Sequence, residues 1–210
     1  GFSVKVKTNI DVNETQPALG GLLILDEKST VLAASPNAPA YDGDLKAFVS
    51  AQAPGQKAIS NLFLNSAGVP SLIFVVPVLV QAEGSQTSEI GRVVGVKQVA
   101  DELYTRLVQP GETTSSGHSV LVQLKDNKIT YLSPINDPQH PVLPLKLQLG
   151  IDTADLDTAF GAQNPGSFAT DKKDYQGRHV LVTSRAINAV PWVLVYTVEY
   201  DEALGAAEAR

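Results

Sequence analysis

The chain has 210 residues, of which 43% are hydrophobic and 18% are charged, and this balance is typical of a folded globular protein. The formal net charge of -6 disfavours nucleic acid and anionic membrane surfaces as partners. The absence of cysteine excludes disulfide bonds, a thiol nucleophile and a thiolate metal site. No apolar run reaches the roughly 20 residues that a membrane-spanning helix needs. Because Gly1 is not a natural start, we expect the chain to be part of a longer protein.

The first half of the sequence predicts a strand-rich unit that ends in a helix. Residues 1–18 are ambiguous, because alternation at 2–7 indicates a strand and the polar stretch after it indicates a loop or a short capped helix. A strand–turn–strand hairpin is expected at about 20–35, and a short helix begins near Asp44. Further strands are expected at 58–64, 70–80 and 90–98, and a helix at 99–108.

The second half predicts the same plan. Pro110-Gly111 stops the preceding helix, and the polar residues up to Gly117 form a linker. A hairpin is expected at 118–133, and a proline-rich loop follows it. The remaining predicted elements are a helix at 153–160, strands at about 166–171, 178–187 and 191–199, and a terminal helix from Asp201.

The two halves repeat one another. Each hairpin ends in a serine, and Ser35 and Ser133 are 98 residues apart. Each closing strand leads into an Asp-Glu pair, at 101–102 and at 201–202, an offset of 100 residues. A period near 100 is too long for a solenoid repeat and matches a small domain. The sequence therefore predicts an α+β protein of two tandem modules, residues 1–110 and residues 111–210.

Specific motifs within these modules resemble those of a known family. The second half contains Asp-Tyr-Gln-Gly-Arg-His-Val-Leu at 174–181 and Pro-Trp-Val-Leu-Val-Tyr-Thr-Val-Glu at 191–199. The first half contains Gly-x-Pro-x-Leu at 68–72 and Gly-Arg-Val-Val-Gly-Val at 91–96. In this order and spacing they resemble the double Cache domains, over residues 20–204. The resemblance implies two tandem PAS-like modules, each a twisted antiparallel sheet of about five strands with flanking helices.

The resemblance also implies a function. Double Cache domains are extracytoplasmic sensor parts of membrane-anchored, dimeric receptors, which are histidine kinases, diguanylate cyclases or chemoreceptors. A small molecule binds in the membrane-distal module, here 1–110, and shifts the terminal helices of the membrane-proximal one, here 111–210. The chain departs from the family at its start, where the strand-like residues 2–7 do not provide the usual stalk helix. It also lacks the family's amino-acid site: residues 44–48 hold no Arg or Trp, and Lys97 stands where those relatives have Asp.

Lys97 is the sharpest candidate for a ligand contact. An ammonium group in a partly desolvated cleft pairs with an anion, so this residue favours a carboxylate or another anion as ligand. The alternative interpretation is that Lys97 faces solvent or pairs with Asp101 or Glu102. The remaining residues predicted to line the same cavity supply aromatic walls and a few polar groups, although each also fits a place in the core or at a strand start; they are Tyr41, Phe48, Asn61, Ser71 and Phe74.

Catalysis has little support in the sequence. There is no Gly-x-Ser-x-Gly motif and no phosphate-binding glycine loop, and the three histidines are scattered without metal-ligand spacing. We therefore expect no enzyme activity in this chain, no cofactor and no metal. The alternative to a ligand sensor is a structural, dimerisation or protein-interaction module whose pocket is filled by its own side chains.

Overall fold

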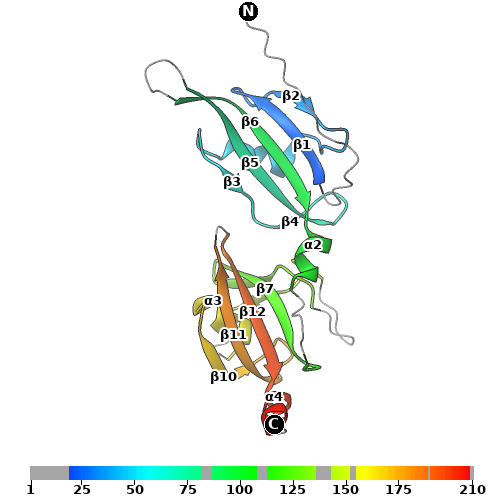
Figure 1. Ribbon diagram of the computed structural model, residues 1–210, viewed down its shortest axis with the longest axis vertical. Helices are drawn as coiled ribbons and strands as arrows, with labels where there is room; N and C mark the ends of the chain where they lie inside the picture. The colour runs from blue at the N-terminus through cyan, green and yellow to red at the C-terminus, as the bar shows by residue number, and fades with distance from the viewer. Residues whose placement is uncertain are drawn as a thin grey trace, which may run out of the picture.

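The computed structural model describes residues 19–81, 87–107, 113–135, 143–151, 155–188 and 190–208. These residues form two antiparallel sheets that follow one another along the long axis of the molecule (Figure 1). The predicted strand at 2–7 and the predicted boundary at 110/111 lie outside the described residues. Among the described helices, none has the length and apolarity that crossing a bilayer requires.

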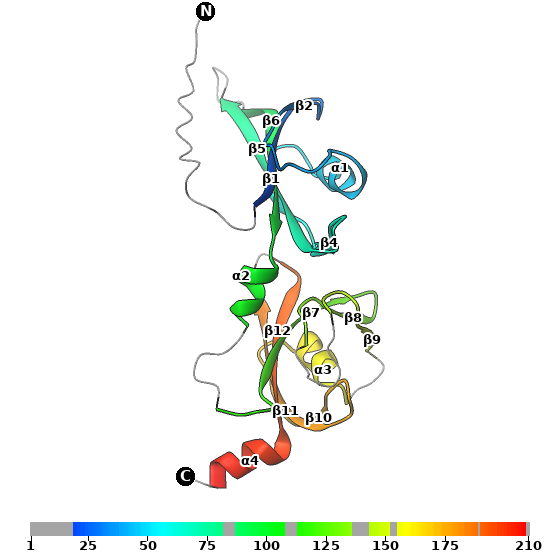
Figure 2. The same ribbon diagram turned by 90° about the vertical axis from the view of Figure 1, so that its right-hand side faces the viewer.

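The first sheet has the strand order β2-β1-β6-β5-β3, with β4 also paired to β5. Its helix α1 (Gly43–Ser50) lies on one face of the sheet (Figure 2), where the apolar side chains of alternate strand residues meet Leu45 and Val49. The helix α2 (Ala100–Thr105) follows the last strand after a single residue. The strands are β1 (Leu19–Asp26), β2 (Val31–Ala34), β3 (Ala58–Ile59), β4 (Phe63–Leu64), β5 (Pro70–Gln81) and β6 (Thr87–Gln98).

The second sheet has the order β10-β11-β12-β7-β8-β9. Its helix α3 (Asp157–Gln163) lies on one face, and α4 (Tyr200–Glu208) continues directly from the last strand (Figure 2). The strands are β7 (His118–Lys125), β8 (Lys128–Tyr131), β9 (Gln148–Gly150), β10 (Phe168–Lys173), β11 (His179–Ile187) and β12 (Trp192–Glu199).

The two sheets have the same topology, which confirms the predicted α+β fold of two PAS-like modules. The path β2-β1-β6-β5-β3 corresponds to β8-β7-β12-β11-β10, and each sheet has one further strand, so both contain six. The repeated serines also have one role. Ser35 Oγ accepts the N–H of Leu22 at 2.9 Å, and Ser133 Oγ accepts the N–H of Leu121 at 2.8 Å. Each hydroxyl thus fastens the end of its hairpin to the opening strand.

Some predicted boundaries differ from those observed. The predicted helix at 153–160 is α3, which begins at Asp157 and ends at Gln163, whereas residues 152–154 lie outside the described part of the chain. The helix predicted at 99–108 begins at Ala100 and ends at Thr105. Helix ends are the least reliable part of any prediction from sequence pattern, because neighbouring residues fit a turn equally well.

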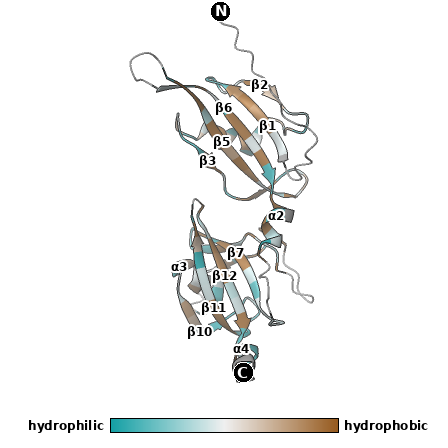
Figure 3. Ribbon diagram, viewed as in Figure 1, coloured by the Kyte–Doolittle hydropathy of each residue, from teal (hydrophilic) through white to brown (hydrophobic). Residues whose placement is uncertain are grey.

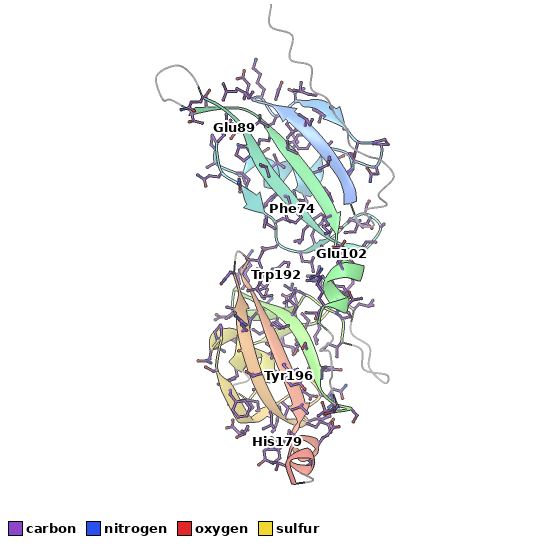
Figure 4. The ribbon with its side chains drawn as sticks, in the orientation of Figure 1. Phe74, Glu89, Glu102, His179, Trp192 and Tyr196 are labelled. Carbon is purple, nitrogen blue, oxygen red and sulfur yellow. The ribbon has the colours of Figure 1, made fainter. Side chains whose placement is uncertain are left out.

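The two modules pack against one another through an apolar cluster. It combines residues from the lower end of the first sheet with residues from the upper end of the second, and Figure 4 shows Phe74 and Trp192 on either side of this junction. Tyr104 of α2 adds a hydrogen bond from its hydroxyl to the carbonyl of Leu132 at 2.9 Å. The buried members of this junction cluster are Leu62, Leu72, Val99, Leu121, Leu132 and Trp192.

Candidate functional site

An apolar core lies between the first sheet and α1. Leu45 and Val49 of α1 pack on Val94 and Val96 of β6 and on residues of β1 and β5. Tyr41 and Phe48 lie against this core, both partly buried. The hydroxyl of Tyr41 is buried and has no hydrogen-bond partner among the described residues. An unsatisfied buried hydroxyl costs about 1–3 kcal/mol, so this oxygen is a place where a polar ligand atom or a water would be stabilised.

Arg92 fastens the end of α1 to the sheet. Its guanidinium donates to the carbonyls of Val49 at 2.7 Å and Gln52 at 3.1 Å, and it pairs with the carboxylate of Glu89 at 2.6 Å. Glu89 also accepts the N–H of Gly55, in the loop after α1. These hydrogen bonds and the positive charge of Arg92 outweigh the cost of burial and hold the pKa of Glu89 below its usual value. The C-terminal end of α1 and the following loop are thus held by one buried charge network.

Lys97 lies on the other face of the sheet. Alternate strand residues point to opposite faces, and the neighbouring Val94 and Val96 belong to the core under α1. The ammonium group of Lys97 pairs with Glu102 of α2 at 2.6 Å, with about a third of its side chain exposed. The structure therefore agrees with the alternative interpretation of the sequence, in which Lys97 pairs with Glu102. A ligand role for Lys97 stays a prediction, on the face opposite to Tyr41 and Phe48.

The other three predicted residues are also dispersed. Ser71 is fully buried at the start of β5, and its hydroxyl donates to the carbonyl of Val69 at 3.0 Å. Phe74 packs in the junction cluster between the modules. Asn61 is exposed, and its Oδ1 accepts from the amide of Gln123 of the second module at 3.3 Å. Of the six candidates, the structure brings together Tyr41 and Phe48.

The second module has a buried polar group where α3 begins. Asp157 is 2% exposed, and its carboxylate accepts the N–H of Thr158 at 2.5 Å. The Thr158 hydroxyl shares a 2.9 Å hydrogen bond with that of Tyr131, whose ring meets Tyr175 edge-on with 6.4 Å between centroids. Burial is the main cause that raises the pKa of Asp157 to about 7, and the charge of Asp174 adds to it. This carboxyl therefore titrates near neutral pH.

The start of α4 and the end of the strand before it make three contacts with other segments of the second module. The carboxylate of Glu202 accepts N–H and O–H groups of Ser115 and Ser116, just before β7. These hydrogen bonds lower the pKa of Glu202 to about 2. Arg178 pairs with Glu199 at 2.7 Å, immediately before the helix, and His179 stacks on Tyr200 with 4.5 Å between ring centroids. Together these contacts link the orientation of α4 to the sheet.

Sequence reasoning did not single out Arg92 or Glu202. Glu202 had a signal, because the Asp-Glu pair after each closing strand is part of the repeat. Arg92 had none, because its partners Val49 and Gln52 lie 43 and 40 residues away in the sequence. In the part of the chain that the structure describes, no group of three or more histidine, aspartate or glutamate residues could hold a metal ion.

No protein-family model matches the sequence, and no curated protein matches it. Solved structures match along most of its length. The extracellular domain of rpHK1S-Z16, described as a histidine kinase, is 16% identical with a TM-score of 0.52, over 90% of this chain and 73% of that one. The ligand-binding domain of Mlp24 with asparagine is 13% identical with a TM-score of 0.51, over 90% and 72%.

A third similar structure is an extracellular ligand-binding receptor from Desulfohalobium retbaense, 15% identical with a TM-score of 0.50. The match covers 89% of this chain but 31% of the receptor, so the chain spans about a third of that protein's length. At these identities the likeness concerns the fold. The chain thus shares its tandem arrangement of two sheets with extracellular domains of receptors and kinases.

Proposed function

Because the chain has the fold of the double Cache sensor domains, we propose that it is the extracytoplasmic, ligand-binding sensor part of a transmembrane signalling receptor. In this proposal the chain itself is not an enzyme, and a catalytic or adaptor output belongs to the rest of the protein. A small molecule binds in the first module and shifts the balance between two arrangements of the domain. It does so by its difference in affinity for the two arrangements, so no chemical step is needed.

The main support for this ligand site is the hydroxyl of Tyr41, which is buried beside α1 and finds no hydrogen-bond partner in the described part of the chain. A ligand with a polar atom at this place would supply the missing hydrogen bond, and the rings of Tyr41 and Phe48 would supply apolar contact. Trp192 Nε1 is also buried without a partner among the described residues, but it lies in the apolar junction cluster. The Tyr41 side of the first sheet is therefore our proposed site.

The proposed signal runs from this site to α4 through covalently and non-covalently linked elements. The sheet strand β6 leads through Val99 into α2, and Val99 is part of the junction cluster. Tyr104 of α2 bonds to Leu132 in the second module, whose strand β12 continues into α4. The Glu202 contacts hold α4 to the same module. Each step is a packed or hydrogen-bonded contact of the kind that carries energetic coupling.

A thermal-shift screen of the purified chain against carboxylates, amino acids, amines, sugars and purines tests the proposal. A ligand at about 100 times its Kd stabilises the fold by about 2.7 kcal/mol, which raises the Tm by several degrees. We expect Tyr41→Phe to weaken the Kd of a hit about threefold to tenfold, since one hydrogen bond is lost. The same variant should raise the Tm without ligand, because a buried unsatisfied hydroxyl has been removed.

Tyr200→Phe is the matched control, since it removes a tyrosine hydroxyl from α4, and we expect it to leave the Kd unchanged. The anion preference suggested by Lys97 is tested in parallel: a carboxylate hit that weakens in Lys97→Ala would support it. A hit whose Kd is the same in Tyr41→Phe would place the ligand elsewhere. No hit in the whole screen would favour the alternative, a structural or protein-interaction module.

A further inference from the structure

The side of the first sheet that α1 covers is apolar and holds few polar side chains. Its buried hydrophobic residues come from α1 and from β1, β5 and β6, and brown prevails along these three strands in Figure 3. In the described part of the first module, the buried polar or charged residues are Ser60, Ser71 and Arg92. Which of their groups are already used therefore decides what kind of ligand this side of the sheet can accept.

The two buried serines use their hydroxyl groups within the protein. Ser60 Oγ donates to the carbonyl of Asn61 at 2.8 Å and accepts the N–H of Ile73 at 2.8 Å. Ser71 Oγ donates to a backbone carbonyl at 3.0 Å. By contrast, the buried hydroxyl of Tyr41 finds no partner in the described ranges of the chain. This hydroxyl can donate one hydrogen bond or accept one, and it carries no charge.

The buried charge of Arg92 is compensated inside the protein. Each of its three guanidinium nitrogens donates to an acceptor, which is the Glu89 carboxylate, the carbonyl of Val49 or the carbonyl of Gln52. The two carboxylate oxygens of Glu89 are used as well, one by Arg92 and the other by the N–H of Gly55. A charged ligand would therefore have to break this network to find a counter-ion.

The other charged residues near this place do not supply a buried counter-ion. Asp42 and Asp44 follow Tyr41 closely in the sequence, but both are exposed, and water and salt weaken the interactions of exposed charges. Lys97 lies on the opposite face of the sheet and pairs with Glu102. A ligand charge that lost its water beside Tyr41 would thus stay uncompensated, which is strongly unfavourable.

We propose that the site beside Tyr41 binds an uncharged, largely apolar molecule with one hydrogen-bonding group, such as an aromatic ketone, alcohol or amide. This ligand class rests on the proposed function, because it names what the same site binds. The polar atom of the ligand pairs with the Tyr41 hydroxyl, and its apolar part packs on Phe48 and the core beneath α1. Carboxylates, amines and zwitterionic amino acids are disfavoured at this place.

Five probes that share a benzene ring and differ in charge test this ligand class: acetophenone, benzyl alcohol, toluene, benzoate and benzylammonium. Each is titrated into the full 210-residue chain, labelled with ¹⁵N, and the amide signals of Tyr41 and of α1 are followed by NMR. We expect acetophenone and benzyl alcohol to bind with a Kd on the order of 1 mM. Benzoate and benzylammonium should bind at least about tenfold more weakly, because their charge stays uncompensated.

The variant Tyr41→Phe tests the hydrogen bond separately. It should raise the Kd of acetophenone about threefold to tenfold and leave that of toluene unchanged, because toluene has no polar atom. Tyr200→Phe is again the control and should change neither value. Circular dichroism verifies that both variants are folded, and the comparison of the five probes in the wild-type chain does not depend on any variant.

Binding of benzoate or benzylammonium at these amides as tightly as acetophenone would overturn the ligand class, as would binding of none of the probes. An unchanged Kd of acetophenone in Tyr41→Phe would overturn it too. The thermal-shift screen, widened to include uncharged ketones, alcohols and amides, separates this failure from that of the proposed function. Hits among charged compounds alone would overturn the ligand class and keep the sensor, whereas no hit in the widened screen would contradict both.

Discussion

The two modules share one strand order but fasten their covering helices by different chemistry. In the first module, the buried guanidinium of Arg92 holds the carbonyls at the end of α1 and pairs with Glu89. In the second, the small hydroxyl of Ser184 donates to the carbonyl of Gly161 of α3 at 3.0 Å, and the helix packs closely on the sheet. Loss of Arg92 would leave a carboxylate and two carbonyls without their partner, whereas loss of the Ser184 hydroxyl would remove one neutral hydrogen bond. The attachment of α1 therefore depends more strongly on a single side chain than that of α3.

Of the substitutions proposed, Arg92→Ala should cause the largest loss of stability. The substitution leaves Glu89 with an unpaired carboxylate and two carbonyls without their donor, so we expect a loss of about 3 kcal/mol in the free energy of unfolding. Urea denaturation followed by circular dichroism measures it. Ser184→Ala, the corresponding change in the second module, should cost about 1 kcal/mol. Equal losses in the two variants would show that the helices are fastened equally strongly.

The second largest effect should be a pH dependence of the free energy of unfolding, which arises in the second module. Burial raises the pKa of Asp157 to about 7, above its value in the unfolded chain, so the native state binds a proton that the unfolded state releases. This contribution is complete at pH values below about 4 and is lost as the pH rises towards about 7. We expect the free energy of unfolding to fall by on the order of 2 kcal/mol between pH 5 and pH 8.

Asp157→Asn keeps an oxygen for the Thr158 N–H and should remove that decline, which denaturation at the two pH values would detect. Glu202 gives a contrast of opposite sign within the same module. Its pKa is lowered to about 2, so its contribution is present above the unfolded value of about 4.5 and is lost as the pH falls towards 2. A decline between pH 5 and pH 8 that persists in Asp157→Asn would contradict the assignment to this carboxyl.

Gly161→Ala tests how closely α3 packs against the second sheet. An added Cβ would lie 3.0 Å from Cβ of Ser184 and 3.0 Å from Cγ2 of Val195, which is closer than such atoms normally approach. Because β11 and β12 would have to move, we expect a loss of about 1–2 kcal/mol in thermal or urea unfolding. Gly205→Ala on α4, where no atom lies within 4 Å, is the control and should be neutral or slightly stabilising.

Lys97→Ala should give the smallest change in stability. The pair with Glu102 is partly exposed, and pairs of this kind contribute at most about 1 kcal/mol. We expect a change of less than about 0.5 kcal/mol, further reduced in high salt. A loss as large as that of Arg92→Ala would show that this surface pair holds α2 as firmly as the buried network holds α1.

The repeat and its hairpins could be predicted because their signals are local. Asp126 and Asn127, with φ of 50° and 57°, are residue types that tolerate the left-handed conformation of a tight turn. Which of the six candidate residues share a face of the sheet could not be predicted, because the position of α1 decides which face is covered, and no local pattern sets that position. The role of Arg92 was not predicted for a similar reason, because its hydrogen-bond acceptor at the end of α1 comes close to it only in the folded chain.

Both closing strands pass into helices without a flexible connection. A single residue separates β6 from α2, and Tyr200 opens α4 directly after Glu199 closes β12. Such a junction acts as a lever, because a rotation of the strand turns the helix by the same angle. Over the nine residues of α4, which span roughly 13 Å, a rotation of 5° would move the far end by about 1 Å. Inserting glycines between Glu199 and Tyr200 would uncouple this lever, while the two sheets would stay as they are.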